Sequence, residues 1–265
     1  MKVSIIITTY NRGGHLRRGL QSLFTRCTKP DDVEVLIIDD GSTDETERVY
    51  LEFRDQKEFK DWNIRYIYNR NPGYLSCSLA KNIGIKQAKG ELLIFTEPEI
   101  LYVTDMISQH LTWQEKGNYL ISAGIIYFVF SKKVTSLTWQ ELQNPKLITE
   151  RSEVQEWGTD FPDIFDIRVR RNEKATYCAS VRKENLMRIG GWDQGFKRWG
   201  FDDLDAIERL GKIGVKNISD NNIICVHLAH GMTGLEWFEE SKRYHERPNK
   251  PTIANQGMKW GEIKK

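Results

Sequence analysis

The sequence predicts an α/β protein with a Rossmann-like, doubly wound and mostly parallel sheet. Three observations support this prediction: short apolar runs rich in Val and Ile, helical spacing of apolar residues between those runs, and 39% hydrophobic residues in a chain of 265. Strands of a parallel sheet are buried on both faces and therefore read as continuous apolar runs. Strands that alternate with helices along the chain form such a sheet.

The alternation is clearest in the first hundred residues. Apolar residues at helical spacing occur over residues 16–24 and again over residues 79–88, as expected for helices that pack on the sheet. The predicted strands of this half are residues 3–7, 33–38, 64–68 and 91–95.

The second half of the chain is less regular. Residues 203–210 have helical spacing, and residues 132–172 are polar, which predicts a loop with short helices that shapes a substrate pocket. After Glu240 the chain is basic and weakly periodic, so we expect it to be mobile or to wrap the surface. The predicted strands are residues 121–130, 175–180 and 223–226.

Composition and charge exclude several classes of protein. The 39 basic and 37 acidic residues leave a net charge of +2, whereas nucleic-acid binders usually carry a strong basic excess. The four cysteines form no CxxC pair, which argues against a zinc site or a disulfide framework. Residues 117–131, the longest stretch without a charge, are too short to span a bilayer. We expect a cytoplasmic protein with no transmembrane segment and no nucleic-acid partner.

Polar residues gather at the carboxyl ends of the predicted strands. They occupy residues 8–11, 39–40, 69–73 and 96–99. In open α/β sheets ligands bind beyond these strand ends. The sequence therefore predicts the functional site at this edge of the sheet.

Four blocks of sequence resemble family 2 glycosyltransferases with the GT-A fold. Residues 3–12 (VSIIITTYNR) and 37–44 (IIDDGSTD) are similar to the opening of that family, and residues 80–91 (AKNIGIKQAKGE) to its next block. Residues 190–203, which contain GGWD and WGFDD, resemble the carboxyl-terminal block of β1,4-galactosyltransferases and polypeptide N-acetylgalactosaminyltransferases.

The resemblance implies a metal-dependent, inverting glycosyltransferase that moves a hexose or N-acetylhexosamine, with galactose or GalNAc favoured, from a UDP-sugar. The acceptor would be a hydroxyl of a glycan or glycolipid. Within one GT-A domain, residues 1–110 would be the nucleotide-sugar-binding half, residues 111–235 the acceptor-binding and catalytic half, and residues 236–265 a basic tail.

The donor site implied by the resemblance surrounds the first two strand ends. Thr8 and Tyr10 would contact the base, and Asp40 would accept a hydrogen bond from its imide edge. Asp39 would contact the ribose or support the turn, and Lys81 would reach a phosphate. The full donor set is Thr8, Tyr10, Asn11, Asp39, Asp40, Gly73, Lys81 and Glu97.

A metal site is implied by the acids after the fourth strand. Glu97-Pro98-Glu99 stands where the family has Asp-x-Asp, so Glu99 would ligate the metal and Glu97 would contact the ribose or the sugar. His230 matches a metal ligand of the galactosyltransferases, and His227 a second one. Because imidazole suits Mn²⁺ better than Mg²⁺, we expect Mn²⁺, with Mg²⁺ as the alternative.

The catalytic acids implied by the resemblance are Asp202 and Asp203, either of which could be the base. Asp205, one turn further on, is predicted to be a surface or capping acid. Trp192 and Trp199 would stack on acceptor sugar rings, although packing in the core is an equal alternative for Trp192.

Charge is unevenly distributed along the chain. Residues 241–265 contain seven basic and two acidic side chains, a net charge of +5, so residues 1–240 carry −3. Acids that converge around an anionic diphosphate require a divalent cation between them. The basic tail could fold over the diphosphate, or contact a partner or the anionic inner face of a membrane.

Two other functions remain open at this stage. A sugar nucleotidyltransferase would share the sheet topology and the metal, but it would usually carry a glycine-rich phosphate loop after the first strand. A catalytically inactive carbohydrate-binding relative would explain why Glu-x-Glu replaces Asp-x-Asp.

Overall fold

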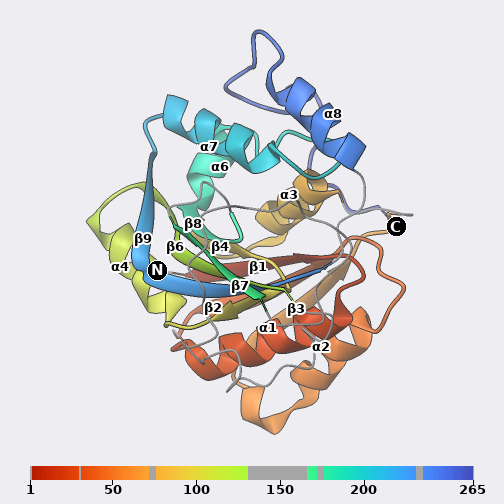
Figure 1. Cartoon of the computed structure of the whole chain (residues 1–265), viewed down its shortest axis with the longest axis vertical. Coiled ribbons are helices and arrows are strands. Elements are labelled where there is room, and N and C mark those ends of the chain that lie inside the picture. The colour runs from red at the N-terminus through yellow and green to blue at the C-terminus, as the bar shows by residue number, and fades with distance from the viewer. Residues whose placement is uncertain are drawn as a thin grey trace.

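A mixed sheet with helices on both faces forms the body of the protein (Figure 1). The computed structural model describes residues 2–29, 31–71, 76–130, 166–171, 176–230 and 235–264. The elements in chain order are β1 (Val3–Thr9), α1 (Gly13–Arg26), β2 (Val33–Asp39), α2 (Thr46–Asp55), a 3₁₀ turn (Lys57–Phe59), β3 (Asn63–Tyr68), α3 (Cys77–Gln87), β4 (Leu92–Thr96), β5 (Ile100–Tyr102), α4 (Met106–Lys116), β6 (Tyr119–Phe130), β7 (Asp166–Arg171), β8 (Cys178–Arg182), α6 (Lys183–Arg188), α7 (Asp202–Lys212), β9 (Lys216–Leu228) and α8 (Leu235–His245).

The strand order of the sheet reverses between the neighbouring strands β1 and β4. The order is β3-β2-β1-β4-β8-β6-β9-β5, and β7 pairs with β6. The first four of these strands are parallel, whereas β8 runs antiparallel to both β4 and β6. From β1 the chain continues to one side through β2 and β3 and then returns to β4 on the other side. Such a reversal is the point at which α/β sheets bind ligands.

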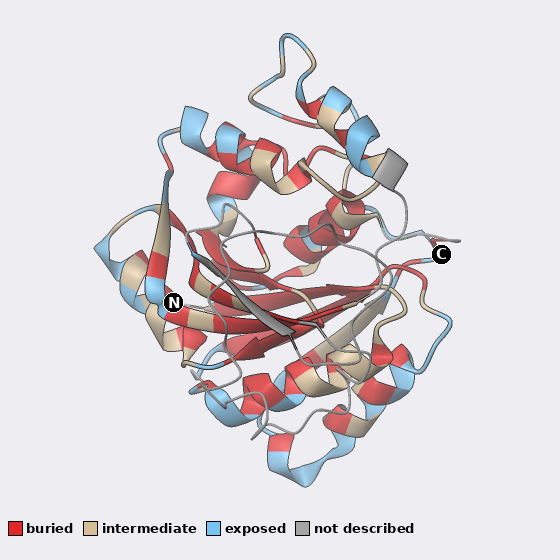
Figure 2. Cartoon of the chain, in the orientation of Figure 1, coloured by how far each residue is buried: buried red, intermediate tan, exposed pale blue. Residues whose placement is uncertain are grey.

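Alternating side chains of the strands build two cores, one on each face of the sheet. Ile5 and Ile7 of β1 face α1 and α2, whereas Ile6 between them faces α3. Because side chains of a strand point alternately to opposite faces, each continuous apolar run serves both layers. Figure 2 shows the sheet buried nearly throughout, with exposed residues on the outer sides of the helices.

The predicted α/β class is confirmed, and so are strands near all the expected positions. Five short or weakly periodic elements were not predicted from the sequence: β5, α4, β7, α6 and α8. The prediction of a loop with short helices over residues 132–172 is wrong at residues 166–171, which form strand β7. Residues 131–165, which contain most of the predicted substrate loop, lie outside the described residues. None of the helices described is long and apolar enough to cross a membrane.

The carboxyl-terminal tail wraps the surface, which was one of the two expected alternatives. After α8, the Ala254 amide donates to the carbonyl of Ile189 (2.8 Å). Near the end of the chain, the Lys264 amide donates to Oδ1 of Asn69 (2.7 Å), and the Lys264 carbonyl accepts from the amide of Arg70 (3.0 Å). The tail thus joins the loop before α7 to the end of β3.

Candidate active site

Two turns at the ends of β1 and β2 are tied together by Asn11. Its backbone amide donates to Oγ of Ser42 (2.8 Å), and its Oδ1 accepts from the amide of Thr43 (2.8 Å). Asn11 has φ of 51°, a left-handed conformation that Asn adopts more readily than most residues. Of the other predicted base contacts on this strand end, Thr8 is buried and Tyr10 is half-buried.

The acids Asp39 and Asp40 are both fully buried and hydrogen-bonded within the turn. Oδ1 of Asp39 accepts from the amides of Gly41 (3.1 Å) and Ser42 (2.7 Å), and its Oδ2 accepts from the Tyr66 hydroxyl. This geometry agrees with the alternative in which Asp39 supports the turn.

Asp40 accepts three hydrogen bonds of 2.6 Å. They come from Nδ2 of Asn69, Nδ2 of Asn71 and the amide of Ser76. Burial raises the pKa of the Asp40 carboxyl above its ordinary value. The turn is therefore rigid in this structure, and the predicted contact of Asp40 with a base stays a prediction. Gly73 lies outside the described residues.

The predicted metal ligands Glu99, His227 and His230 come together beside β5. Pairing of β5 with β9 sets Ile100 opposite His227, and the Leu228 amide donates to the Glu99 carbonyl (2.9 Å). Oε1 of Glu99 lies 3.0 Å from Nε2 of His230 and 4.0 Å from Nε2 of His227. One ligand atom from each residue lies within 4.8 Å of the other two.

The protonation states of this cluster suit a divalent cation. Burial lowers the pKa of His227 to about 3, so the imidazole is neutral. Burial alone would raise the pKa of Glu99, but His230 and His227 beside it hold that pKa well below its usual range. Within the described residues Oε2 of Glu99 is buried without a hydrogen-bond partner. The ionised carboxylate of Glu99 and the neutral imidazole of His227 fit Mn²⁺.

Close packing against α1 positions the Glu97-Pro98-Glu99 turn. A Cβ at Gly19 would lie 2.6 Å from the Pro98 carbonyl oxygen, so only glycine lets the turn approach the helix this closely. Glu97 is half-buried, and its burial together with the charge of Glu99 raises its pKa to about 8. Its predicted contact with ribose or sugar is not tested by this geometry.

The predicted catalytic acids begin α7 and enclose Lys81 from α3. Nζ of Lys81 lies 2.5 Å from Oδ1 of Asp203, 3.6 Å from Oδ2 of Asp202 and 3.2 Å from Oγ1 of Thr176. Burial by itself would lower the pKa of Lys81, which is 4% exposed, but the two acids raise that pKa. The structure therefore places Lys81 on the acid pair, where the sequence predicted a phosphate contact.

The two acids have different surroundings. Oδ1 of Asp203 also accepts from Nε1 of Trp192 (2.9 Å), and its Oδ2 accepts from the amide of Thr176 (3.3 Å). Although burial opposes ionisation, Lys81 and these donors lower the pKa of Asp203. Within the described residues Oδ2 of Asp202 has no hydrogen-bond partner, and burial raises the pKa of Asp202 to about 6.

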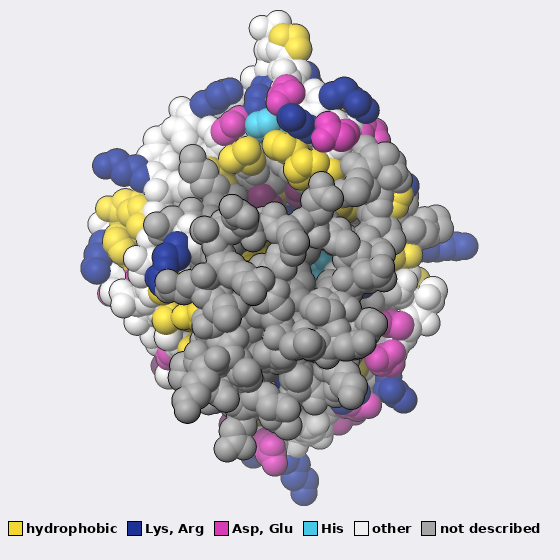
Figure 3. Space-filling view, in the orientation of Figure 1, with side chains coloured by type: hydrophobic (Ala, Val, Ile, Leu, Met, Phe, Trp, Pro, Cys, Tyr) yellow, Lys and Arg dark blue, Asp and Glu magenta, His cyan; other side chains and the backbone are white. Residues whose placement is uncertain are grey.

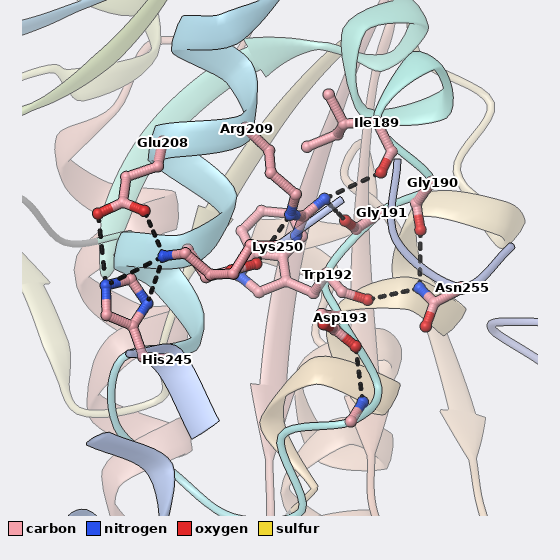
Figure 4. Close-up of polar contacts among 12 residues, drawn as sticks. Ile189, Gly190, Gly191, Trp192, Asp193, Glu208, Arg209, His245, Lys250 and Asn255 are labelled. Atoms are coloured by element: carbon pink, nitrogen blue, oxygen red, sulfur yellow. Dashed lines mark hydrogen bonds and ion pairs between the residues drawn. The ribbon is translucent and has the colours of Figure 1, made fainter. Parts of the chain in front are cut away.

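Trp192 is part of the core beneath the acid pair, which corrects its predicted role at the acceptor. It is 1% exposed and its ring packs on Phe95 with centroids 4.7 Å apart, so no ring face is open to a sugar. Its amide and carbonyl both bond to the Asn82 side chain (2.8 Å each). Nδ2 of Asn255 from the tail donates to the same carbonyl (2.7 Å) (Figure 4).

A buried ion pair braces the loop that carries Trp192. Nε of Arg209 donates to Oδ2 of Asp205 (2.7 Å), and its Nη1 donates to the carbonyls of Ile189 (2.9 Å) and Gly191 (2.7 Å) (Figure 4). Arg209 is 2% exposed and Asp205 is equally buried. The expectation of a surface or capping acid at Asp205 is therefore wrong, because its helix turns this side chain toward the loop.

Aromatic side chains lie beside the start of α7. Trp199 is half-buried, and its ring centroid lies 5.5 Å from that of Phe238 on α8; Phe201 lies 5.0 Å from the same ring. Phe201, directly before Asp202, has φ of 60°, and such strain in a bulky residue is common at functional sites. Figure 3 shows hydrophobic side chains above a hollow in the upper part of this face, with acidic side chains deeper within it.

Several residues of the site were missed from the sequence: Asn82, Thr176, Phe201, Arg209, Phe238 and Asn255. Asn82 and Phe201 lie inside blocks that resemble known glycosyltransferases and so carried a signal. The others act through contacts between segments distant in sequence, which residue spacing does not reveal.

A family model described as Glycosyl transferase family 2 matches residues 4–178, well over half of the chain. The chain is 27% identical over 226 residues to Validoxylamine A glucosyltransferase of Streptomyces hygroscopicus subsp. limoneus, covering 80% of this chain and 48% of that protein. It is 25% identical over 264 residues to the uncharacterized glycosyltransferase YfnE of Bacillus subtilis (strain 168), covering 87% of this chain and 65% of that one. The chain thus spans about half to two thirds of the length of these relatives.

Solved structures with a similar fold include the mannosyltransferase PcManGT from Pyrobaculum calidifontis in complex with GDP-Man and Mn²⁺. It has a TM-score of 0.60 and 18% identity, over 92% of this chain and 61% of that one. S. aureus TarS 1-349 in complex with UDP has a TM-score of 0.58 and 15% identity, over 92% and 64%. The galactosyltransferase-like block at residues 190–203 lies entirely beyond the family match, and neither structure is a galactosyltransferase by name. That resemblance therefore stays a prediction.

Proposed function

Because the chain belongs to glycosyl transferase family 2 and has the GT-A fold of its structural neighbours, we propose that it is a metal-dependent, inverting glycosyltransferase. It transfers a hexose or N-acetylhexosamine from a UDP-sugar to an acceptor hydroxyl of a glycan or glycolipid. One observation carries this proposal: Glu99 of the metal cluster and the acid pair of α7 all lie close enough to Glu97 for their charges to raise the pKa of its carboxyl.

The donor is proposed to lie beyond the carboxyl ends of β1 and β4, where the strand order reverses. Asn11 and the buried acids Asp39 and Asp40 hold the turns that follow β1 and β2. Galactose and GalNAc are the first candidates for the sugar because of the block at residues 190–203, and glucose joins them because a relative is a glucosyltransferase. The remaining proposed donor contacts are Thr8, Tyr10, Gly73 and Glu97.

The proposed metal ligands are Glu99, His230 and His227. Oε2 of Glu99, which has no hydrogen-bond partner among the described residues, and the neutral imidazole of His227 supply ligand atoms that suit Mn²⁺. A bound cation of this kind neutralises the negative charge that develops on a diphosphate leaving group.

Asp202 is proposed as the base. As the acceptor oxygen attacks the anomeric carbon, the bond from that carbon to the diphosphate breaks, and Asp202 takes the hydroxyl proton. In the part of the chain that the structure describes, Oδ2 of Asp202 has no hydrogen-bond partner, and the pKa of Asp202 is raised to about 6. Both properties suit this task, because a base works best with a pKa near the working pH. Asp203, bonded to Lys81 and Trp192, keeps the pair in place.

A donor panel tests the proposal. UDP-glucose, UDP-galactose, UDP-GlcNAc, UDP-GalNAc and GDP-mannose are each incubated with the protein and Mn²⁺, and binding and release of nucleoside diphosphate are measured with and without chelator. We expect Mn²⁺-dependent release from at least one UDP-sugar. If no nucleotide sugar binds at millimolar concentration, the proposal fails. Pyrophosphate release from UTP and a sugar phosphate would instead indicate a nucleotidyltransferase.

A cytoplasmic location, with contact to the inner face of the membrane through the basic tail, remains part of the proposal. The tail backbone is bonded to the body of the protein, but Arg243 and Lys259 remain exposed on it. These exposed cations could therefore contact an anionic membrane surface or an anionic partner.

A further inference from the structure

A cationic pocket lies between the loop before Trp199 and helix α8. It has a volume of about 300 Å³. Four cations and one acid are among the residues that line it: Lys197, Arg198, Arg243, Arg247 and Glu240.

Two of the four cations already have partners in the fold. Nη2 of Arg247 lies 2.6 Å from Oδ2 of Asp193, and its guanidinium lies 3.7 Å from the centre of the Tyr244 ring. The guanidinium of Arg198 lies 4.0 Å from the centre of the Trp237 ring. These contacts hold both side chains in place at the wall of the pocket.

The other two cations are exposed. Among the residues that the structure describes, neither Lys197 nor Arg243 forms an ion pair, and Nζ of Lys197 donates to the carbonyl of Gln194 (3.2 Å). When Glu240 of the lining and Asp193, which pairs with Arg247, are counted against the four cations, a net charge of about +2 is left at the pocket. Such a surplus in a concave, partly enclosed space attracts an anion more strongly than the same charges on a flat surface.

The pocket shares a wall with the acceptor side of the proposed site. Ser241 lines the pocket and its hydroxyl donates to the carbonyl of Trp199 (3.0 Å). Arg198 directly precedes Trp199, and the Trp199 and Phe201 rings both contact Phe238 of α8. Going back along the chain from Asp202, the aromatic residues Phe201 and Trp199 are therefore followed by the cations Arg198 and Lys197.

We propose that this pocket binds an anionic group, a phosphate or a carboxylate, carried by the acceptor away from the hydroxyl that reacts. The inference rests on the proposed function, since it names the chemical class of the acceptor at that site. Arg and Lys donate charge-assisted hydrogen bonds to both kinds of anion. The aromatic side chains offer apolar faces to the sugar ring that carries the group.

Paired ligands test this inference. Binding of a hexose 6-phosphate, a hexuronic acid and the neutral hexose is measured by calorimetric or NMR titration at low salt, with UDP and Mn²⁺ saturating so that the donor site is filled. We expect at least one anionic sugar to bind about tenfold more tightly than the neutral sugar, as charge-assisted contacts suggest. The stronger of the two anions separates phosphate from carboxylate.

The double variant Lys197→Ala/Arg243→Ala should lose the preference for the anionic sugar. The matched control is Lys212→Ala/Lys216→Ala, which removes the same charge at exposed positions of α7 and β9. This control should keep the preference. Equal binding of neutral and anionic sugars overturns the inference, and so does an equal loss in both variants. Binding of the wild type to anionic phospholipid vesicles that the double variant loses, without any sugar preference, would indicate a membrane contact instead. Donor hydrolysis by the Lys197→Ala/Arg243→Ala variant should match that of the wild type. If the wild type hydrolyses no donor, the proposed function fails, but the sugar-binding result still decides whether the pocket binds an anion.

Discussion

In the described part of the chain, buried carboxylates in the turn after β2 are fully hydrogen-bonded, whereas one carboxylate of the acid pair on α7 is not. In the turn, Asp39 and Asp40 each accept three hydrogen bonds from groups of the fold. On α7, Asp203 is bonded in a similar manner, but Oδ2 of Asp202 is buried without a hydrogen-bond partner in the described structure. A buried acceptor left unbonded is unfavourable for folding, whereas a fully bonded carboxylate is a poor base. The three fully bonded carboxylates therefore differ from Asp202, the carboxylate proposed as the base.

The largest expected effect is on catalysis by Asp202. Asp202→Asn removes the proposed base and should lower kcat by about 10³-fold, within the range that general bases contribute. The substrate KM should change little because the proposed donor site is untouched. Initial rates of UDP release with a working donor and acceptor measure both constants. If the variant keeps a tenth or more of the wild-type kcat, Asp202 is not the base.

The next effect concerns the metal ligands. Glu99→Gln keeps the shape of the side chain but removes the ionised oxygen, so Mn²⁺ affinity should fall by about 10²-fold, as loss of a ligand charge implies. Titration with Mn²⁺, followed by electron paramagnetic resonance, measures the dissociation constant without relying on activity. Glu115→Gln, at an exposed position of α4, is the control. Equal affinities in the two variants would show that Glu99 is no ligand.

The third test compares stability across the two regions. Asp40→Asn places an amide nitrogen, which cannot accept a hydrogen bond, opposite at least one of the three donors, so the free energy of unfolding should fall by about 2 kcal/mol. Asp202→Asn should leave stability unchanged or increase it, since it removes an incompletely bonded buried charge. Urea unfolding of the two variants measures both values. The contrast between the two regions fails if Asp202→Asn is the more destabilising change.

A smaller effect is expected where the tail meets the site. Asn255→Ala removes two hydrogen bonds to the carbonyls of Gly190 and Trp192, and Trp192 bonds directly to Asp203. We expect kcat to fall about tenfold, together with a loss of about 2 kcal/mol of stability. Asn249→Ala is a matched control, because Asn249 also has a positive φ (56°, against 55°) but is exposed. Equal effects of the two variants would assign the loss to backbone strain alone.

The sequence predicted the first half of the fold well because its signals are local. Each buried strand of that half is a continuous run such as residues 3–7, and each polar turn follows its strand directly. The metal cluster was also predicted as a set, but only through the resemblance of the blocks to a family. Composition alone gives no reason for Glu99 to meet His230, which lies across the β5–β9 pairing.

The parts that were missed depend on contacts between distant segments. Trp192 looked equally suited to stacking on a sugar or to the core, and its burial is decided by Phe95 and Asn82, which are about a hundred residues away in the chain. Asp205 looked like a surface acid, because nothing in its helix shows that Arg209 turns inward with it. The tail looked mobile or loosely wrapped, and its bonds to residues 69–70 and 189–192 follow from tertiary packing.

The pH dependence of kcat/KM tests the central claim about the acid pair most directly. Burial raises the pKa of Asp202 to about 6, Lys81 opposes that rise, and Asp203 adds to it; Glu97 and Cys77 are the other titratable groups that face the pair. Below its pKa the carboxyl is protonated and cannot accept the acceptor proton. At saturating Mn²⁺ we therefore expect a plateau above pH 7 and a tenfold fall per pH unit below about pH 6. A profile that stays flat down to pH 4.5, the range of an ordinary exposed carboxylate, would contradict the assignment of Asp202 as the base.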